Sequence, residues 1–140
     1  MSQPLAFVVD DDVSLGTAFK TALEMCGFGV ELIDDSEVAL RRIVEQMPDV
    51  IMLDIQMPKI SGSEILRSLR SDEKLARLKV IVVTANSLMA QDETINDLAD
   101  LVLLKPVSLT QIVDFASRLT QSEDQNQDKD HDDSASDGTR

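Results

Sequence analysis

Five short apolar runs alternate with amphipathic segments along the first 120 residues, and this alternation leaves few folds open to the chain. Each run has the length of a β-strand and is rich in Val, Ile and Leu. The runs cover residues 5–9, 30–33, 50–53, 80–83 and 101–104. Four of them are continuously apolar, which is typical of parallel strands that helices cover on both faces. The second contains Glu31, and a polar residue at this place favours a strand at the edge of the sheet.

Apolar residues at spacings of three and four predict helices between these runs and after the last one. The predicted helices lie around residues 15–26, 40–47, 65–69, 88–99 and 109–119. Strict alternation of strands and helices requires right-handed crossovers. The pattern therefore predicts an α/β fold with a doubly wound, five-stranded parallel sheet of order 2-1-3-4-5, the flavodoxin-like arrangement.

Charge and cysteine content disfavour several classes of function. Lys and Arg number 13 against 26 Asp and Glu, and the net charge of −13 disfavours binding to nucleic acid. One cysteine and one histidine cannot form a usual zinc site. Because no apolar run approaches the length of a membrane span, we expect a cytoplasmic protein without a membrane partner. Residues 121–140 are acidic and almost free of apolar side chains, which predicts a disordered tail after a single domain of residues 1–120.

Polar side chains follow four of the predicted strands, at the edge where sheets of this order bind ligands. Three aspartates, residues 10–12, follow the first strand, and Asp54 follows the third. Thr84 ends the fourth strand, and Lys105 follows the fifth. Each alone has an ordinary interpretation as a helix cap, a loop start or a strand exit. Together they predict a crevice in which Mg²⁺ relieves the repulsion between the acids and a carboxylate attacks phosphorus.

The chain resembles the receiver domain of two-component response regulators, the CheY-like superfamily, over residues 5–120. The matching stretches are FVVDDD (7–12), VIMLDIQMPKISG (50–62), VIVVTA (80–85) and LLKP (103–106). The resemblance implies the flavodoxin-like (βα)5 receiver fold and a phospho-accepting regulator of a two-component or phosphorelay system. Such a protein is not an enzyme in the usual sense, because it catalyses only its own phosphorylation and dephosphorylation.

The same resemblance assigns roles to the acids of the crevice. It implies that Asp54 is the phosphorylated nucleophile and that Mg²⁺ is the cofactor. Asp10 and Asp11 match the acid pair of the metal site, with Asp11 as the expected direct ligand. Asp54 and the backbone carbonyl of Gln56 complete the implied set of metal ligands. Asp12 falls where the family varies, and we assign it to capping of the helix that follows.

The resemblance also covers the remaining polar residues and the partner. Thr84 matches the switch hydroxyl, and Lys105 matches the lysine that contacts the phosphoryl group. By the same analogy the Lys105–Pro106 bond is expected to be cis, as only about 5–6% of X–Pro bonds are. Residues 1–120 contain no histidine, so the phosphoryl donor is expected to come from outside the domain. The resemblance implies that this donor is a phosphohistidine on a sensor histidine kinase or a histidine phosphotransfer protein.

Two positions depart from the usual receiver pattern, and both lie on the face through which receivers commonly signal. Val102 stands where many receivers carry an aromatic residue, and Leu98 replaces the usual small residue near the end of the fourth helix. We therefore expect the chemistry to be kept and the output relay to differ. The more apolar face favours contact with a downstream protein target or with a second copy of the chain, as a homodimer.

Other interpretations explain fewer of these residues. In a phosphatase of the haloacid-dehalogenase type Asp10 would be the nucleophile, but only Asp114, in a predicted helix, could supply the acids required after Lys105. A flavodoxin-like electron carrier needs a hydroxyl-rich loop where this chain has three aspartates. A calcium-binding EF-hand loop fails at Leu15 and Thr21, where Gly and Glu are required. A receiver that serves only as a scaffold stays open, although every expected site residue is present.

Overall fold

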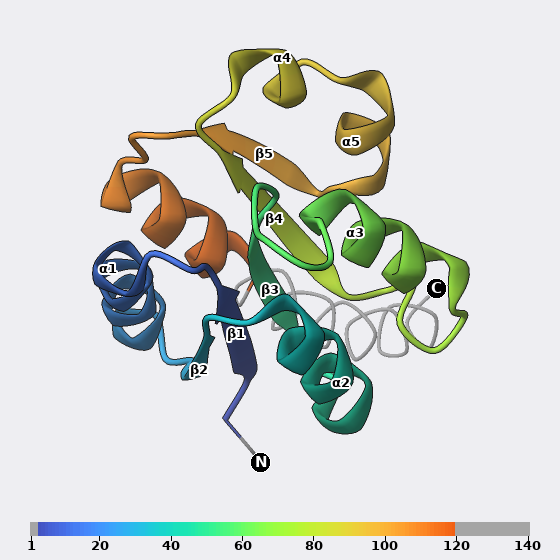
Figure 1. Ribbon diagram of the computed structural model, residues 1–140. Coiled ribbons are helices and arrows are strands. Elements are labelled where there is room, and N and C mark those ends of the chain that lie inside the picture. Colours follow the sequence, from blue (N-terminus) through green and yellow to red (C-terminus); the bar gives the residue numbers. More distant parts are fainter. Residues whose placement is uncertain (1–2, 120–140) are drawn as a thin grey trace, which may run out of the picture.

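The computed structural model describes residues 3–119, in which five parallel strands form one sheet with helices on both faces (Figure 1). The strands are β1 (Leu5–Val9), β2 (Gly29–Ile33), β3 (Val50–Asp54), β4 (Lys79–Thr84) and β5 (Leu101–Leu104). Their order, β2-β1-β3-β4-β5, confirms the predicted topology and places β2 at an edge. The predicted acidic tail, residues 121–140, lies outside the described residues, so that prediction and the domain boundary before it stay predictions.

Helices cover the two faces of the sheet unequally. They are α1 (Val13–Met25), α2 (Ser36–Gln46), α3 (Gly62–Ser71), α4 (Ser87–Ala90), α5 (Glu93–Leu98) and a helix over residues 109–119. α1 and the helix 109–119 pack on one face, and α2, α3 and α5 pack on the other (Figure 1). In β1, Phe7 and Val9 enter one hydrophobic cluster and Ala6 and Val8 enter the other, which explains its unbroken apolar sequence. No helix within residues 3–119 is long and apolar enough to cross a membrane.

The single helix predicted around residues 88–99 is wrong, because the structure has two short helices there. The side chains of Asn86 and Asp92 each accept hydrogen bonds from backbone N–H groups one turn ahead, so each begins a separate helix. Asn96 closes the break, since its side-chain amide donates to the carbonyls of Ala90 and Asp92. Polar side chains that bond to the backbone have interrupted a weak apolar stripe.

The register of the strands brings the motif residues to one edge of the sheet. Val9 pairs with Leu53 and Leu53 pairs with Val82, so β1, β3 and β4 end close together. Thr84 pairs with Leu104, the last residue of β5. The residues that end or follow these strands therefore meet at the carboxyl edge, as expected at the switch point of a doubly wound sheet.

Candidate functional site

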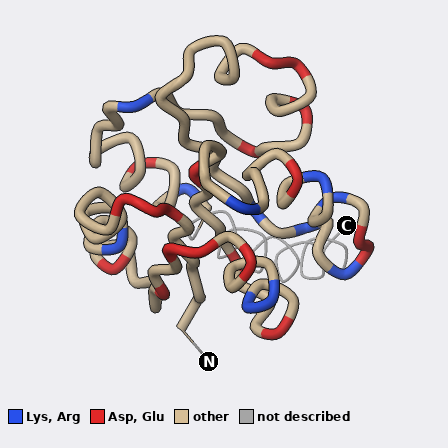
Figure 2. The backbone as a smooth tube through the Cα atoms, viewed as in Figure 1, with Lys and Arg blue, Asp and Glu red and all other residues tan. Residues whose placement is uncertain are grey.

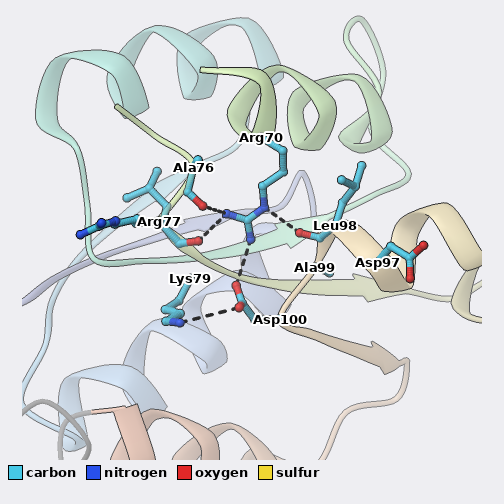
Figure 3. A pocket seen from close by; sticks show the side chains of 9 residues that line it. Arg70, Ala76, Arg77, Lys79, Asp97, Leu98, Ala99 and Asp100 are labelled. Atoms are coloured by element: carbon cyan, nitrogen blue, oxygen red, sulfur yellow. Dashed lines mark hydrogen bonds and ion pairs between the residues drawn. The ribbon is translucent and has the colours of Figure 1, made fainter. Parts of the chain in front are cut away.

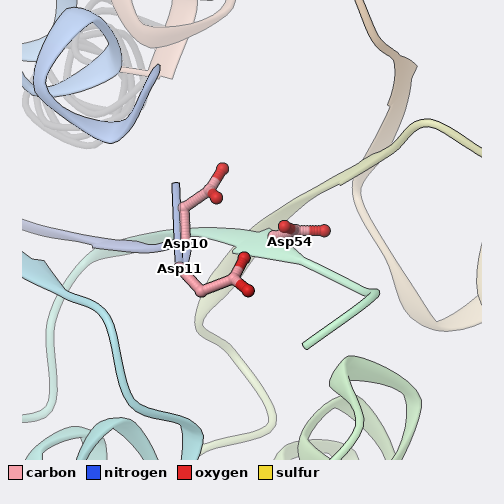
Figure 4. Close-up of side chains that lie close together, drawn as sticks. All are labelled: Asp10, Asp11 and Asp54. Carbon is pink, nitrogen blue, oxygen red and sulfur yellow. The ribbon is translucent and has the colours of Figure 1, made fainter. Parts of the chain in front are cut away.

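Three carboxylates converge just beyond the ends of β1 and β3 (Figure 4). One oxygen from each of Asp10, Asp11 and Asp54 lies within 4.8 Å of the other two. Asp10 and Asp54 are buried, whereas Asp11 is exposed. The loops that follow β1 and β2 are acidic as well, because residues 10–12 and 34–35 are all Asp, and Figure 2 shows acidic residues along both loops. The field at this edge therefore attracts cations.

Asp10 is a buried acid whose hydrogen-bonding capacity is only partly used. Its Oδ1 accepts a hydrogen bond from the backbone N–H of Asp12 at 2.9 Å. Its Oδ2 is buried and has no hydrogen-bond partner among the described residues, although the Lys105 Nζ lies within ion-pair range at 3.5 Å. Burial raises the pKa of Asp10 to about 6; the Asp12 N–H opposes this rise and the charge of Asp54 reinforces it. A buried oxygen without a donor is costly, so the site favours a ligand that contacts it.

Lys105 faces both buried acids from the end of β5, beside a cis bond to Pro106 that confirms the prediction. Its Nζ donates to Asp54 Oδ2 at 3.3 Å and lies 3.5 Å from Asp10 Oδ2. Burial by itself would lower the pKa of Lys105, but the charges of Asp10 and Asp54 outweigh it and the pKa is raised. The cluster thus holds three carboxylates and one ammonium, which contacts two of them, and the site keeps an excess of negative charge.

Asp54 also fixes the start of the β3–α3 loop, residues 55–61. Its Oδ1 accepts a hydrogen bond from the Gln56 backbone N–H at 3.0 Å. The loop closes where the Gly62 N–H donates to the Ile55 carbonyl at 3.1 Å. A Cβ on Gly62 would lie 2.4 Å from the Ile55 Cα, so only glycine fits this position of the motif. The backbone of Gln56 therefore lies beside Asp54, and its carbonyl as a metal ligand stays a prediction.

Thr84 is fully buried at the end of β4 and connects this edge to α4. Its Oγ1 accepts a hydrogen bond from the Asn86 backbone N–H at 3.0 Å. The Asn86 side chain in turn caps α4 by accepting from Leu88 and Met89. A displacement of the Thr84 hydroxyl would therefore change the first contact that holds α4.

The residues at this edge fit a hard divalent cation. Mg²⁺ prefers oxygen ligands and usually takes one or two carboxylates with water and phosphate oxygens. The acid group that could hold a metal contains only Asp side chains. Its most deeply buried member, Asp10, offers an oxygen that is already removed from water and has no donor. This donor set matches Mg²⁺ better than a softer metal, which would favour Cys or His.

Sequence analysis missed Ser36, a buried hydroxyl that contacts the β3–α3 loop from another element. Ser36 begins α2, and its Oγ donates to the Pro58 carbonyl at 2.9 Å and accepts from the Ile60 N–H at 3.0 Å. Beside it, Asp35 caps α2 and pairs with Lys59. The sequence indicates a helix start at Asp35 and Ser36. It does not indicate their contacts with the β3–α3 loop, because more than twenty residues separate the partners.

Comparison with known proteins identifies relatives of the chain. The family model for the response regulator receiver domain matches residues 6–117. The response regulator MprA of Mycolicibacterium vanbaalenii is 35% identical over 107 residues, which cover 76% of this chain and 46% of that protein. The DNA-binding dual master transcriptional regulator RpaA of Synechocystis is 30% identical over 111 residues, which cover 79% of this chain and 46% of that protein. The chain thus spans about half the length of the curated relatives it matches.

Solved structures of similar fold include two further regulators. The receiver domain of the Francisella response regulator 1452 superposes with a TM-score of 0.75 at 27% identity, covering 86% of this chain and 98% of that one. The chemotaxis response regulator CheY4 of Vibrio cholerae gives a TM-score of 0.75 at 22% identity, covering 84% of this chain and 98% of that one. At that identity the second likeness concerns the fold alone, which is the flavodoxin-like fold of CheY.

Proposed function

The chain belongs to the response regulator receiver domain family, and we propose that Asp54 is the residue that accepts its phosphoryl group. Receiver domains are phosphoacceptors in two-component signalling and do not turn over a separate substrate as usual enzymes do. One observation carries the proposal. Asp54 is a buried acid whose Oδ1 is held by the Gln56 N–H and whose Oδ2 is held by Lys105, so its carboxylate is oriented before any donor arrives.

We propose that the metal ligands are the carboxylates of Asp10, Asp11 and Asp54 and the backbone carbonyl of Gln56. The spacing of the three carboxylates and the unpartnered Oδ2 of Asp10 support this set. When bound, Mg²⁺ supplies positive charge against the phosphoryl oxygens. That charge also offsets the burial and, to a lesser extent, the repulsion from Asp54, which together raise the pKa of Asp10 in the metal-free protein.

In the transfer, a carboxylate oxygen of Asp54 attacks the phosphorus of a phosphohistidine on the partner. The bond between phosphorus and the imidazole nitrogen breaks, and its electron pair leaves with the imidazole. The ammonium of Lys105, 3.3 Å from Asp54 Oδ2, is placed to contact a phosphoryl oxygen and to stabilise its charge. The resulting acyl phosphate carries more negative charge than the carboxylate it replaces.

We propose that Thr84 transmits this change of charge. Its hydroxyl accepts from the Asn86 N–H in the unphosphorylated protein. Once it turns to donate to the new phosphoryl group, the start of α4 loses part of its support, and the segment of α4 and α5 takes another arrangement. This segment has few buried residues, because only Ile95 among those of α4 and α5 is buried, so it is suited to move.

Histidine kinases are the phosphoryl donors of response regulators, and we propose that one of them, or a histidine phosphotransfer protein, serves this chain. We propose an output through protein contacts at the face of α4, β5 and the helix 109–119, made by a downstream target or a second copy. The exposed side chains of Leu88 and Leu104 on this face support contact with a partner. The acidic charge of the domain argues against direct contact with nucleic acid.

The proposal is tested by treating the full chain with acetyl phosphate and Mg²⁺ and measuring the intact mass. We expect the wild-type protein to gain one phosphoryl group and the Asp54→Asn variant to gain none. Asp97→Asn, the same change at an exposed acid on α5, should be labelled like the wild type. Full labelling of Asp54→Asn, or a phosphoryl group mapped to Asp10, would show that another residue is the acceptor.

A further inference from the structure

The middle of the β3–α3 loop has a backbone conformation that its own sequence does not favour. Lys59 has φ at 71°, in the left-handed region that side chains with a Cβ rarely adopt. Such a residue keeps this conformation only where its surroundings hold it. The ends of the loop are fixed by bonds from the Ile55 N–H to the Val83 carbonyl and from the Gly62 N–H to the Ile55 carbonyl, both 3.1 Å long. These bonds leave the conformation around Lys59 to be fixed by another contact.

The Ser36 hydroxyl supplies that contact on both sides of Lys59. It donates to the carbonyl of Pro58 at 2.9 Å and accepts from the N–H of Ile60 at 3.0 Å. Ser36 is 1% exposed, so water cannot replace these two bonds at little cost. It is also the first residue of α2, a helix anchored in the core by Ala39 and Ile43. The loop is thereby fastened to a rigid element.

An ion pair repeats the connection at the surface. The Lys59 ammonium bonds to Asp35, and this bond lowers the pKa of Asp35 and raises that of Lys59. The Lys59 side chain is 52% exposed, and exposed pairs of this kind contribute little to stability. The buried hydroxyl of Ser36 is therefore the principal link between the β3–α3 loop and the start of α2, and the ion pair is secondary.

We propose that Ser36 is a positioning residue for the metal site, because it holds the β3–α3 loop in the conformation that presents the Gln56 carbonyl. The inference rests on the proposed function, in which that carbonyl is a ligand. Gln56 lies two residues before Pro58, and its own N–H is held by Asp54 Oδ1 at 3.0 Å. Asp54 holds the loop at Gln56 and Ser36 holds it at Pro58, so the short segment from Gln56 to Pro58 has little freedom. Binding of the ion therefore does not carry the entropic cost of ordering the Gln56 carbonyl.

The test measures Mg²⁺ affinity of the full chain by titration calorimetry, together with hydrogen exchange of the metal-free protein. Loss of a group that orients a metal ligand commonly weakens metal affinity by about 10- to 100-fold. Because Ser36 acts through the backbone, we expect Ser36→Ala to weaken Mg²⁺ binding by about tenfold and to speed exchange of the Ile60 amide. Ser71→Ala removes a hydroxyl that donates within α3, to the Ser68 carbonyl, and should match the wild type in both measurements.

Two further variants make every outcome decisive. Ser36→Cys nearly keeps the volume and weakens only the hydrogen bonds, so it replaces Ser36→Ala if that variant does not fold, with a smaller loss of affinity expected. A Ser36 variant that is less stable but binds Mg²⁺ like the wild type would overturn the positioning role. Asp11→Asn separates this failure from a wrong metal site. If it weakens Mg²⁺ binding while the Ser36 variants do not, only the role of Ser36 is refuted, and if it has no effect, the proposed metal site is wrong.

Discussion

The two ends of the sheet both collect charged groups, but they satisfy them differently. At the carboxyl end, three aspartates face one lysine, and an oxygen of Asp10 has no hydrogen-bond partner among the described residues. At the amino ends of β4 and β5, the guanidinium of Arg70 lies in a pocket where nearly every donor is used (Figure 3). It donates to the carbonyls of Ala76, Leu78 and Leu98 and to the carboxylate of Asp100.

The difference separates a structural site from the proposed functional one. Arg70 joins the end of α3 to the segment before β4 and to the turn between α5 and β5, and nearly all of its donors are used without any ligand. The cluster around Asp10 is incomplete by the same criterion, since burial raises the pKa of that acid and leaves one oxygen without a donor. Buried polar groups without partners are uncommon in proteins, and they mark places where a ligand or an ion completes the structure.

The comparison predicts that Arg70→Met harms stability without harming chemistry. The variant keeps the aliphatic stem but removes charged hydrogen bonds to four partners, one of them a carboxylate. Because each such bond contributes about 1.5–3 kcal/mol and water reaches part of the pocket, we expect the free energy of unfolding to fall by about 2–4 kcal/mol. Urea unfolding measures this loss, and calorimetry at a temperature where the variant is folded should find wild-type Mg²⁺ affinity.

Arg67→Met is the matched control, because Arg67 is exposed on the same helix. It should change stability by no more than about 0.5 kcal/mol. If Arg70→Met instead weakened Mg²⁺ binding as strongly as a change at Asp11, the two ends of the sheet would be coupled and their separation would be wrong.

The reverse result is predicted at the other end of the sheet, where Asp10→Asn should stabilise the metal-free protein. The pKa of Asp10 is raised from its ordinary value of 3.8 to about 6, so the ionised carboxylate costs stability at pH 7.5. A shift of this size corresponds to at most about 3 kcal/mol, and loss of the ion pair with Lys105 reduces the gain, so we expect about 1–2 kcal/mol. Chemical unfolding in the presence of a chelator measures it.

The same variant should bind Mg²⁺ more weakly, which would show that stability is given up for the ligand site. Asp11→Asn is the informative control, since Asp11 is exposed: it should weaken Mg²⁺ binding while leaving the metal-free stability nearly unchanged. If Asp10→Asn instead destabilised the metal-free protein, the ion pair between Asp10 and Lys105 would contribute more to stability than the burial of the Asp10 charge costs.

The sequence predicted the carboxyl end of the sheet far better than the amino end, for a physical reason. Asp54, Thr84 and Lys105 each adjoin an apolar strand, and parallel strands that end together bring such residues together. Arg70 and Ser36 lie on helices, and their partners lie on segments whose placement depends on how helices pack. No periodicity or strand-end rule connects them, so only the three-dimensional structure shows these contacts.

The break between α4 and α5 was missed for a different reason. Asp92 and Asn96 are both compatible with an exposed helix face. Their side chains bond to the backbone here because the Ile95 N–H and the Ala90 carbonyl are free to bond with them, and the sequence does not show this. The apolar stripe over residues 88–99 was the weakest of the five, and local hydrogen bonds outweighed it.

The smallest predicted effect is a pH dependence that belongs to the carboxyl end alone. Because the pKa of Asp10 is higher in the folded protein, protonation of Asp10 stabilises the fold. This stabilisation is fully present below pH 3.8 and is lost as the pH rises through about 6. Between pH 7.5 and 5 the metal-free protein should therefore gain about 1 kcal/mol.

The pKa values of Glu31 and Asp35 are instead lowered, by bonds to Arg42 and Lys59, so their contributions are lost only at more acidic pH and do not mask this gain. Urea unfolding at the two pH values measures it, with Asp10→Asn as the reference that should show no such rise. Saturating Mg²⁺ should reverse the trend, because the ion binds the ionised carboxylates and protons compete with it. If the wild type and Asp10→Asn had the same pH profile without metal, the pH dependence would not come from Asp10, and the unpartnered oxygen of Asp10 would have to be satisfied by water.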